Sequence, residues 1–146
     1  DECGVDAAIN YKTCGDLTEA LAAVAPDGID VYFENVGGDH LQAALAVMNP
    51  FGRIAACGMI ASYNDAEPVP GPNNLMLIVG KKIRINGFIV SDHGDMREEF
   101  LAEMIPWIQE GKIKSRETMV TGLDNATGAF LGLFSGQNFG KMVVKI

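Results

Sequence analysis

Two short apolar segments that each run into a glycine turn constrain this chain most. The first covers residues 29–38, Ile-Asp-Val-Tyr-Phe-Glu-Asn-Val-Gly-Gly, and the second covers residues 52–63, Gly-Arg-Ile-Ala-Ala-Cys-Gly-Met-Ile-Ala-Ser-Tyr. In an open parallel sheet, ligands bind just beyond the carboxyl ends of the strands. Small residues at these ends let main-chain N–H groups approach a ligand closely. Two such strand ends with one helix between them predict the inner part of a nucleotide-binding sheet.

Strands and helices are predicted to alternate through this part of the chain. Strands are expected at 7–11, 29–33 and 53–57. One helix is expected after Asp16, an N-cap residue with Glu19 three positions later, and a second is expected from near Asp39. The buried face of the second helix is predicted from its helical spacing to hold Leu41, Ala44, Leu45 and Met48. This alternation with short connections favours right-handed crossovers, and it predicts an α/β fold with a parallel sheet flanked by helices.

In the remaining segments, strands and helices no longer alternate with short connections. Residues 59–74 form a long connection with three prolines, which is typical of a binding loop. A brief helix at 75–80 leads to an edge strand at 83–90, with Lys81 and Lys82 expected to be solvated at its entrance. A helix at 96–110 ends at a glycine. The tail beyond it is predicted to pack separately, as a strand at 117–120, a helix at 125–135 capped by Asp124, and a strand at 141–146.

Charge and cysteine content exclude several classes of function. The net charge of -8 repels phosphate backbones and argues against a nucleic-acid partner. No apolar run approaches the length that spans a bilayer, which argues against a membrane protein. The three cysteines, at 3, 14 and 57, form no Cys-x-x-Cys pair, so neither a disulfide framework nor a zinc site is expected. We expect a cytoplasmic protein in a reducing compartment.

Seven motifs in a fixed order give the chain a resemblance to a known family. They are Asn-Tyr-Lys at 10–12, Phe-Glu-Asn-Val-Gly-Gly at 33–38, Cys-Gly-Met-Ile-Ala-Ser-Tyr-Asn at 57–64, Pro-Gly-Pro at 70–72, Phe-Ile-Val at 88–90, Glu-Gly-Lys-Ile at 110–113 and Asn-Phe-Gly-Lys at 138–141. In these the chain resembles the zinc-independent medium-chain dehydrogenases/reductases, in particular the leukotriene/prostaglandin reductase branch of NADPH-dependent double-bond reductases. The likeness covers only the C-terminal part of such an enzyme. It implies a Rossmann-like domain at 1–111 and a tail at 112–146 that returns to a GroES-like substrate domain.

The resemblance also implies which residues meet the cofactor NADP. Tyr11 is expected near its adenosine phosphate end, Asn35 near the nicotinamide ribose, and Asn138 reaches the nicotinamide from the tail. The other implied contacts line the cofactor from the strand ends into the long loop: Cys57, Gly58, Met59, Ile60, Ala61, Ser62 and Tyr63, with Phe88, Ile89 and Val90 against the nicotinamide. The family's glycine-rich phosphate turn has no counterpart in the sequence, so a fragment of a longer enzyme is expected, inactive by itself.

Tyr63 is the predicted catalytic residue. The implied reaction is hydride transfer to the C=C bond of an α,β-unsaturated ketone or aldehyde, and a hydroxyl could stabilise the negative charge that develops on the carbonyl oxygen. A homodimer through the edge strand at 83–90 is expected. The alternatives are a quinone oxidoreductase of the same superfamily and a non-catalytic nucleotide-binding or assembly module.

Simpler structural interpretations stay open for several of these residues. Asn35 could only close a turn, since asparagine is common in turns. Cys57 is expected to be a small buried strand residue whose backbone meets the cofactor. Tyr63 could be an exposed loop aromatic, and His40 is expected to be structural or solvated.

Overall fold

The computed structural model describes residues 3–146, which form two compact units. One unit is Val5–Arg97, and the other holds residues 98–146 with Cys3 and Gly4. The sequence also predicts that residues 1–4 are the end of a helix capped by Gly4; residues 1 and 2 lie outside the described residues, and Gly4 has a φ of 66°. Compactness alone does not define a folding domain, so the domain boundary predicted after residue 111 stays a prediction.

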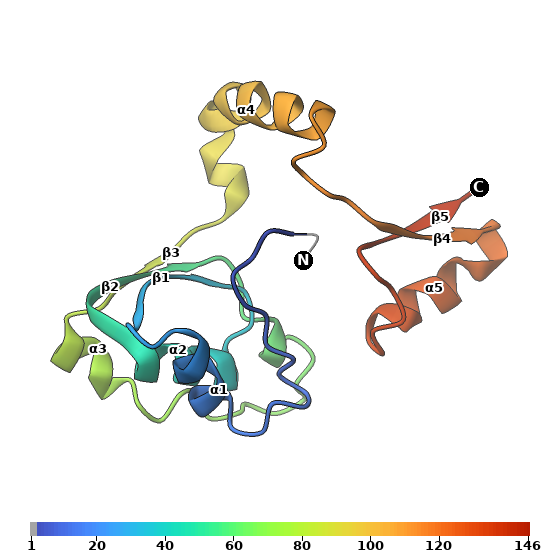
Figure 1. Ribbon diagram of the computed structural model, residues 1–146. Helices are drawn as coiled ribbons and strands as arrows, with labels where there is room; N and C mark the ends of the chain where they lie inside the picture. The colour runs from blue at the N-terminus through green and yellow to red at the C-terminus, as the bar shows by residue number, and fades with distance from the viewer. Residues whose placement is uncertain (1–2) are drawn as a thin grey trace. The chain divides into compact units, whose positions relative to one another are not determined.

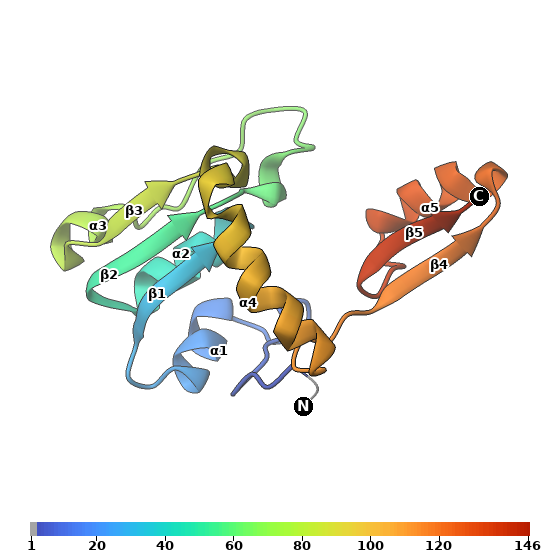
Figure 2. The same cartoon turned by 90° about the horizontal axis from the view of Figure 1, so that it is seen from above.

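The first unit is a three-stranded parallel sheet with helices on one face. Its strands β1 (Ile29–Glu34), β2 (Met48–Ala56) and β3 (Arg84–Gly87) lie in that order, side by side (Figure 2). The helices α1 (Leu17–Val24), α2 (Gly38–Val47) and α3 (Met76–Lys81) lie on the same side of the sheet (Figure 1). The α/β class and the parallel pairing predicted from the sequence are therefore confirmed.

The core of this unit lies between α2 and the sheet. Its five buried members, all apolar, are Leu41, Leu45, Met48, Ile54 and Ile83. The predicted buried face of α2 is confirmed, because Leu41, Ala44, Leu45 and Met48 are at most 6% exposed. The predicted N-cap of α1 is also confirmed, since Asp16 Oδ1 accepts a hydrogen bond of 2.8 Å from the Glu19 N–H.

The second unit pairs two parallel strands alongside one helix. Strands β4 (Glu117–Thr121) and β5 (Lys141–Lys145) pair directly, and α5 (Ala126–Leu133) connects them (Figure 2). Helix α4 (Arg97–Gln109) precedes them, and a 3₁₀ turn, Leu123–Asn125, leads into α5. The predicted Asp124 cap is wrong: the N-cap of α5 is Asn125, whose side chain donates to the Thr121 carbonyl instead.

Two strand predictions need correction. Residues 7–11 form no strand, because their backbone pairs with no strand in the described part of the chain. The Asn10 carbonyl instead accepts hydrogen bonds from the N–H groups of Thr13 and Cys14, which closes a turn. The edge strand predicted at 83–90 spans only Arg84–Gly87, and a 3₁₀ helix begins at Val90. It ends early because its partner β2 ends at Ala56, whose carbonyl accepts the N–H of Phe88.

Lys81 is not solvated as expected but closes the C-terminal end of α2. Its ammonium donates to the carbonyls of Leu45, Ala46 and Met48 at 3.1, 2.7 and 2.8 Å. The last carbonyls of a helix lack partners within the helix, and a positive charge there also complements the helix dipole. Lys81 therefore fixes the point where α2 turns into β2.

We expect Lys81→Met to lower the free energy of unfolding by about 1–3 kcal/mol, because it leaves three partly buried carbonyls without their charged donor. Urea unfolding measures this loss. Lys82→Met is the matched control, since the ammonium of Lys82 lies over the exposed ring of Phe51, 5.6 Å from its centroid. Equal losses for the two variants would contradict the capping role.

A carboxylate lies in the interior next to a tyrosine, under the end of β1. Glu34 is 0% exposed, and Tyr32 packs against the apolar core two residues before it. Burial raises the pKa of the Tyr32 hydroxyl well above its ordinary value of 10.0, and the charge of Glu34 and hydrogen bonding to it add to the rise. The Glu34 Oε2 atom nevertheless has no partner at good hydrogen-bond geometry among the described residues. We therefore regard the contact as mainly electrostatic.

This contact predicts a loss of stability in alkali. Above pH 10 the unfolded chain loses the Tyr32 proton while the folded protein keeps it, so the folded state becomes less stable as pH rises. Tyr32→Phe removes that proton from both states. The free energy of unfolding, measured with urea from about pH 8 to about pH 11, should fall less steeply for the variant than for the unaltered protein. Equal slopes would show that Tyr32 does not contribute.

Candidate functional site

The turn after β1 is organised by the side chain of Glu34. Its buried Oε1 accepts hydrogen bonds from the N–H groups of Val36 and Gly37, the second at 2.9 Å. Gly37 is the N-cap of α2 and has a φ of 76°, a conformation that side chains with a Cβ rarely adopt. The carboxylate therefore lies at the positive end of the helix, where a negative charge is stabilising.

The two glycine turns are joined into one surface by main-chain hydrogen bonds. The Glu34 carbonyl accepts from the N–H groups of Cys57 and Gly58, at 2.9 and 3.1 Å. Beyond them, the Ile60 N–H donates to Asn35 at 3.1 Å and the Ala61 N–H donates to Val36 at 2.9 Å. We call residues 34–37 and 57–63 the strand-end wall. Its two parts are distant in sequence, and parallel pairing of β1 with β2 brings them together.

Tyr63 folds back onto its own loop at this wall. Its hydroxyl oxygen accepts a hydrogen bond of 3.0 Å from the Met59 N–H. A Cβ on Gly58 would lie 3.1 Å from that oxygen, so glycine there leaves room for the tyrosine. The side chain is 65% exposed, and a hydroxyl that accepts one hydrogen bond can still donate its own hydrogen. Tyr63 is therefore an exposed aromatic, as the simpler interpretation held, but one with a fixed hydroxyl.

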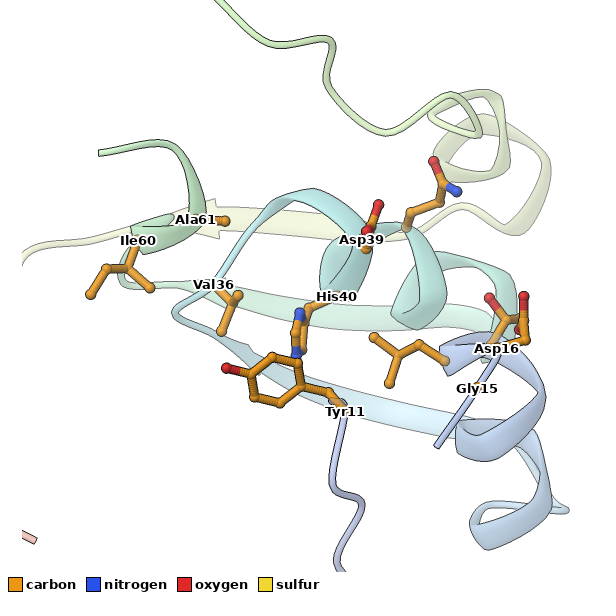
Figure 3. Close-up of a pocket in the computed structure, with 11 residues that line it drawn as sticks. Tyr11, Gly15, Asp16, Val36, Asp39, His40, Ile60 and Ala61 are labelled. Atoms are coloured by element: carbon orange, nitrogen blue, oxygen red, sulfur yellow. The ribbon is translucent and has the colours of Figure 1, made fainter. Parts of the chain in front are cut away.

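An open cavity of about 660 Å³ lies beside the wall. Figure 3 shows Val36, Ile60 and Ala61 toward one end of it, Gly15 and Asp16 toward the other, and the rings of Tyr11 and His40 between them. These two rings meet edge to face, with centroids 5.0 Å apart. The starts of α1 and α2 add further polar groups: Asp16, Thr18, Asp39 and Gln42. The cavity therefore combines apolar wall residues with hydrogen-bonding groups.

The predicted site residues of the first unit divide into two groups. Asn35 and 57–63 form the wall, and Tyr11 shares the cavity with Ile60 and Ala61. Phe88 lies next to the wall, with its ring 5.9 Å from that of Phe33, while Ile89 and Val90 are exposed beyond β3. Cys57 is an exposed free thiol, which corrects the expectation that it is buried. Cofactor contact by any of these residues stays a prediction.

Asn138 belongs to the second unit and is described there by itself. Its side-chain amide donates to the Gly140 carbonyl at 2.6 Å, within the connection that leads into β5. Its predicted reach toward the nicotinamide also stays a prediction.

Sequence reasoning gave no role to two residues of the site. Glu34 belongs to the motif at 33–38, and the signal that could have identified it is a carboxylate at the end of an apolar strand, three residues before an N-cap glycine. His40 was expected to be structural or solvated, yet it lines the cavity next to Tyr11. Its position in the first turn of α2, just after the strand-end turn, was the available signal.

Residues 3–146 contain neither a cluster of metal ligands nor a membrane-spanning helix. The side chains described there include no cluster of three or more His, Cys, Asp or Glu that could hold a metal ion. None of the helices described is both long and apolar enough to cross a bilayer.

Similar proteins share both the sequence and the fold. The chain is 48% identical to the NADP(+)-dependent 2-alkenal reductase of Nicotiana tabacum over 98% of its length, and 44% identical to prostaglandin reductase 1 of Bos taurus over 97%. The crystal structure of CurA from Vibrio vulnificus in complex with NADPH superposes with a TM-score of 0.86 at 43% identity, covering 97% of this chain. The chain spans only 41%, 44% and 43% of these three proteins, respectively.

The family profile described as zinc-binding dehydrogenase matches residues 3–144, nearly the whole described chain. The similar proteins and the parallel α/β fold agree with this match. The chain therefore belongs to the zinc-binding dehydrogenase family, within the medium-chain dehydrogenase/reductase fold.

Proposed function

We propose that this chain forms the nicotinamide side of an NADPH-dependent reductase that acts on the C=C bond of α,β-unsaturated ketones or aldehydes. The observation that carries the proposal is the strand-end wall with the fixed, exposed hydroxyl of Tyr63. Two similar proteins support it, since one is an NADP(+)-dependent 2-alkenal reductase and the crystal structure of the other holds NADPH. The activity belongs to the full-length protein, because those relatives are more than twice as long as this chain.

The wall has the chemistry that a dinucleotide needs. Glycines at 37 and 58 let the two turns pack closely, since a Cβ at Gly37 would lie 3.1 Å from the Cβ of Met59 and one at Gly58 would lie 3.1 Å from the Tyr63 hydroxyl. Asn35 offers an exposed amide beside them, and Tyr11 and His40 provide aromatic surface across the cavity. We infer that Asn35, residues 57–63 and Tyr11 hold the cofactor, with Phe88, Ile89, Val90 and Asn138 completing the nicotinamide end. Bound NADPH would supply the hydride.

In this proposal, the chain's own residues orient the substrate and stabilise the negative charge that forms on it. When a conjugated carbonyl compound is reduced at its β-carbon, negative charge develops on the carbonyl oxygen. A donor aimed at that oxygen lowers the barrier. The Met59 N–H holds the Tyr63 oxygen in place, which leaves the hydroxyl hydrogen for this task. Apolar side chains of the wall, such as Met59 and Ile60, would exclude water from the same surface.

The assembly and location of the protein are also proposed. We propose a zinc-independent enzyme, as the resemblance to the double-bond reductase branch implies. We propose a cytoplasmic homodimer that pairs through β3, which lies at an edge of its sheet. The domain boundary after residue 111 and the return of the tail to a GroES-like substrate domain belong to the same proposal.

We expect Tyr63→Phe in the full-length protein to lower kcat for an enone by roughly 10²-fold, the usual cost of removing one oxyanion donor. Steady-state kinetics measures this change. Tyr11→Phe removes the same atom at the predicted adenosine end, and should weaken NADPH binding rather than slow turnover. Unchanged kcat in Tyr63→Phe would remove this residue from the mechanism.

Substrate comparison tests the class of reaction. The proposal predicts a higher kcat/KM for a simple enone than for a quinone, each with NADPH. The reverse order would identify a quinone oxidoreductase. NADPH binding without oxidation by either substrate would identify a nucleotide-binding module.

A further inference from the structure

Among the residues that the structure describes, Glu34 is the only buried polar or charged side chain, and it forms no salt bridge with any of them. Burying a carboxylate costs free energy unless hydrogen bonds or opposite charge compensate. Here the compensation comes from the main chain, since Oε1 accepts from Val36 and Gly37 at the start of α2.

The same residue connects both halves of the strand-end wall. Its side chain holds the amides of 36 and 37, and its carbonyl accepts from Cys57 and Gly58. The carbonyls of Asn35 and Val36, which lie inside the loop that Oε1 closes, accept from Ile60 and Ala61. The position of residues 57–61 therefore depends on the turn that Glu34 shapes.

We propose that Glu34 is a positioning residue for the cofactor: it acts as an internal hydrogen-bond acceptor that occupies the amides of Val36 and Gly37, just before α2, and thereby holds Asn35 and residues 57–61 in the binding arrangement. This inference rests on the proposed function, because it concerns the same cofactor wall.

The role depends on the acceptor oxygens of the side chain, which two substitutions separate from its charge. Glu34→Met keeps the approximate length of the side chain but removes both oxygens, so it cannot accept from either amide. Glu34→Gln keeps the reach and an acceptor oxygen but removes the charge. Glu19→Met and Glu19→Gln make the same changes at an exposed position of α1 and serve as matched controls.

The experiment uses the full-length protein and three measurements. Amide hydrogen exchange without cofactor reports the bonds at Val36 and Gly37. NADPH fluorescence titration gives Kd, and enone kinetics separates KM from kcat. We expect Glu34→Met to lose protection at both amides and to raise Kd and KM for NADPH by about 10-fold, the equivalent of one charge-assisted hydrogen bond, with kcat changed by less than about 3-fold. Glu34→Gln and both Glu19 variants should stay within about 3-fold of the unaltered protein.

The KM-against-kcat pattern distinguishes positioning from a loss of folded protein. A smaller folded fraction lowers kcat at unchanged KM, whereas a displaced binding wall raises KM. Glu34→Met that binds NADPH normally would overturn the positioning role, and so would a defect in Glu34→Gln as large as that in Glu34→Met. Failure of the unaltered protein to bind NADPH is a different result, which overturns the proposed function itself.

Discussion

Parallel pairing of β1 with β2 is the constraint on which the rest of the first unit depends. Two parallel neighbours cannot be joined by a tight hairpin, so the chain must cross over through α2. The crossover buries the apolar face of α2 against the sheet, which makes the core. It also brings the carboxyl ends of both strands to the same edge, where their turns meet and form hydrogen bonds. Core and site are thus two results of one connection.

The ends of α2 are each fixed by a charged side chain from elsewhere in the unit. Glu34 binds the amides at its start, and Lys81 binds the carbonyls at its end. Both charges complement the helix dipole. A helix held in this way cannot slide along the sheet without breaking charge-assisted hydrogen bonds. The strand-end wall is held in the same way, since α2 starts directly after it.

The parts of this structure that follow local rules could be predicted from the sequence. Helical spacing identified Leu41, Ala44 and Leu45 as core, and the Asp16 cap follows from capping chemistry. The wall was predicted in outline, because apolar strands that end in glycine turns meet at one edge of a parallel sheet. The motifs that predicted the family are also local, and the comparisons agree with them.

Features that depend on distant partners could not be predicted. A lysine before a strand gives no sign that it will bind three carbonyls at the end of α2 and the start of β2, as Lys81 does. Residues 7–11 have strand composition, but a strand also needs a neighbour with which to pair. The Met59 N–H bond to Tyr63 depends on the course of an irregular loop, for which sequence offers no periodic signal.

The main-chain character of the wall has a consequence for how such a surface changes over evolutionary time. Its four joining hydrogen bonds use only backbone atoms, so they impose almost no requirement on the side chains at Met59 and Ile60. Those side chains are exposed and can be exchanged while the frame stays intact. Mutation is restricted mainly at the glycines, where any added carbon meets a neighbour. A lineage could therefore acquire preferences for different substrates through point changes in this loop without rebuilding the fold.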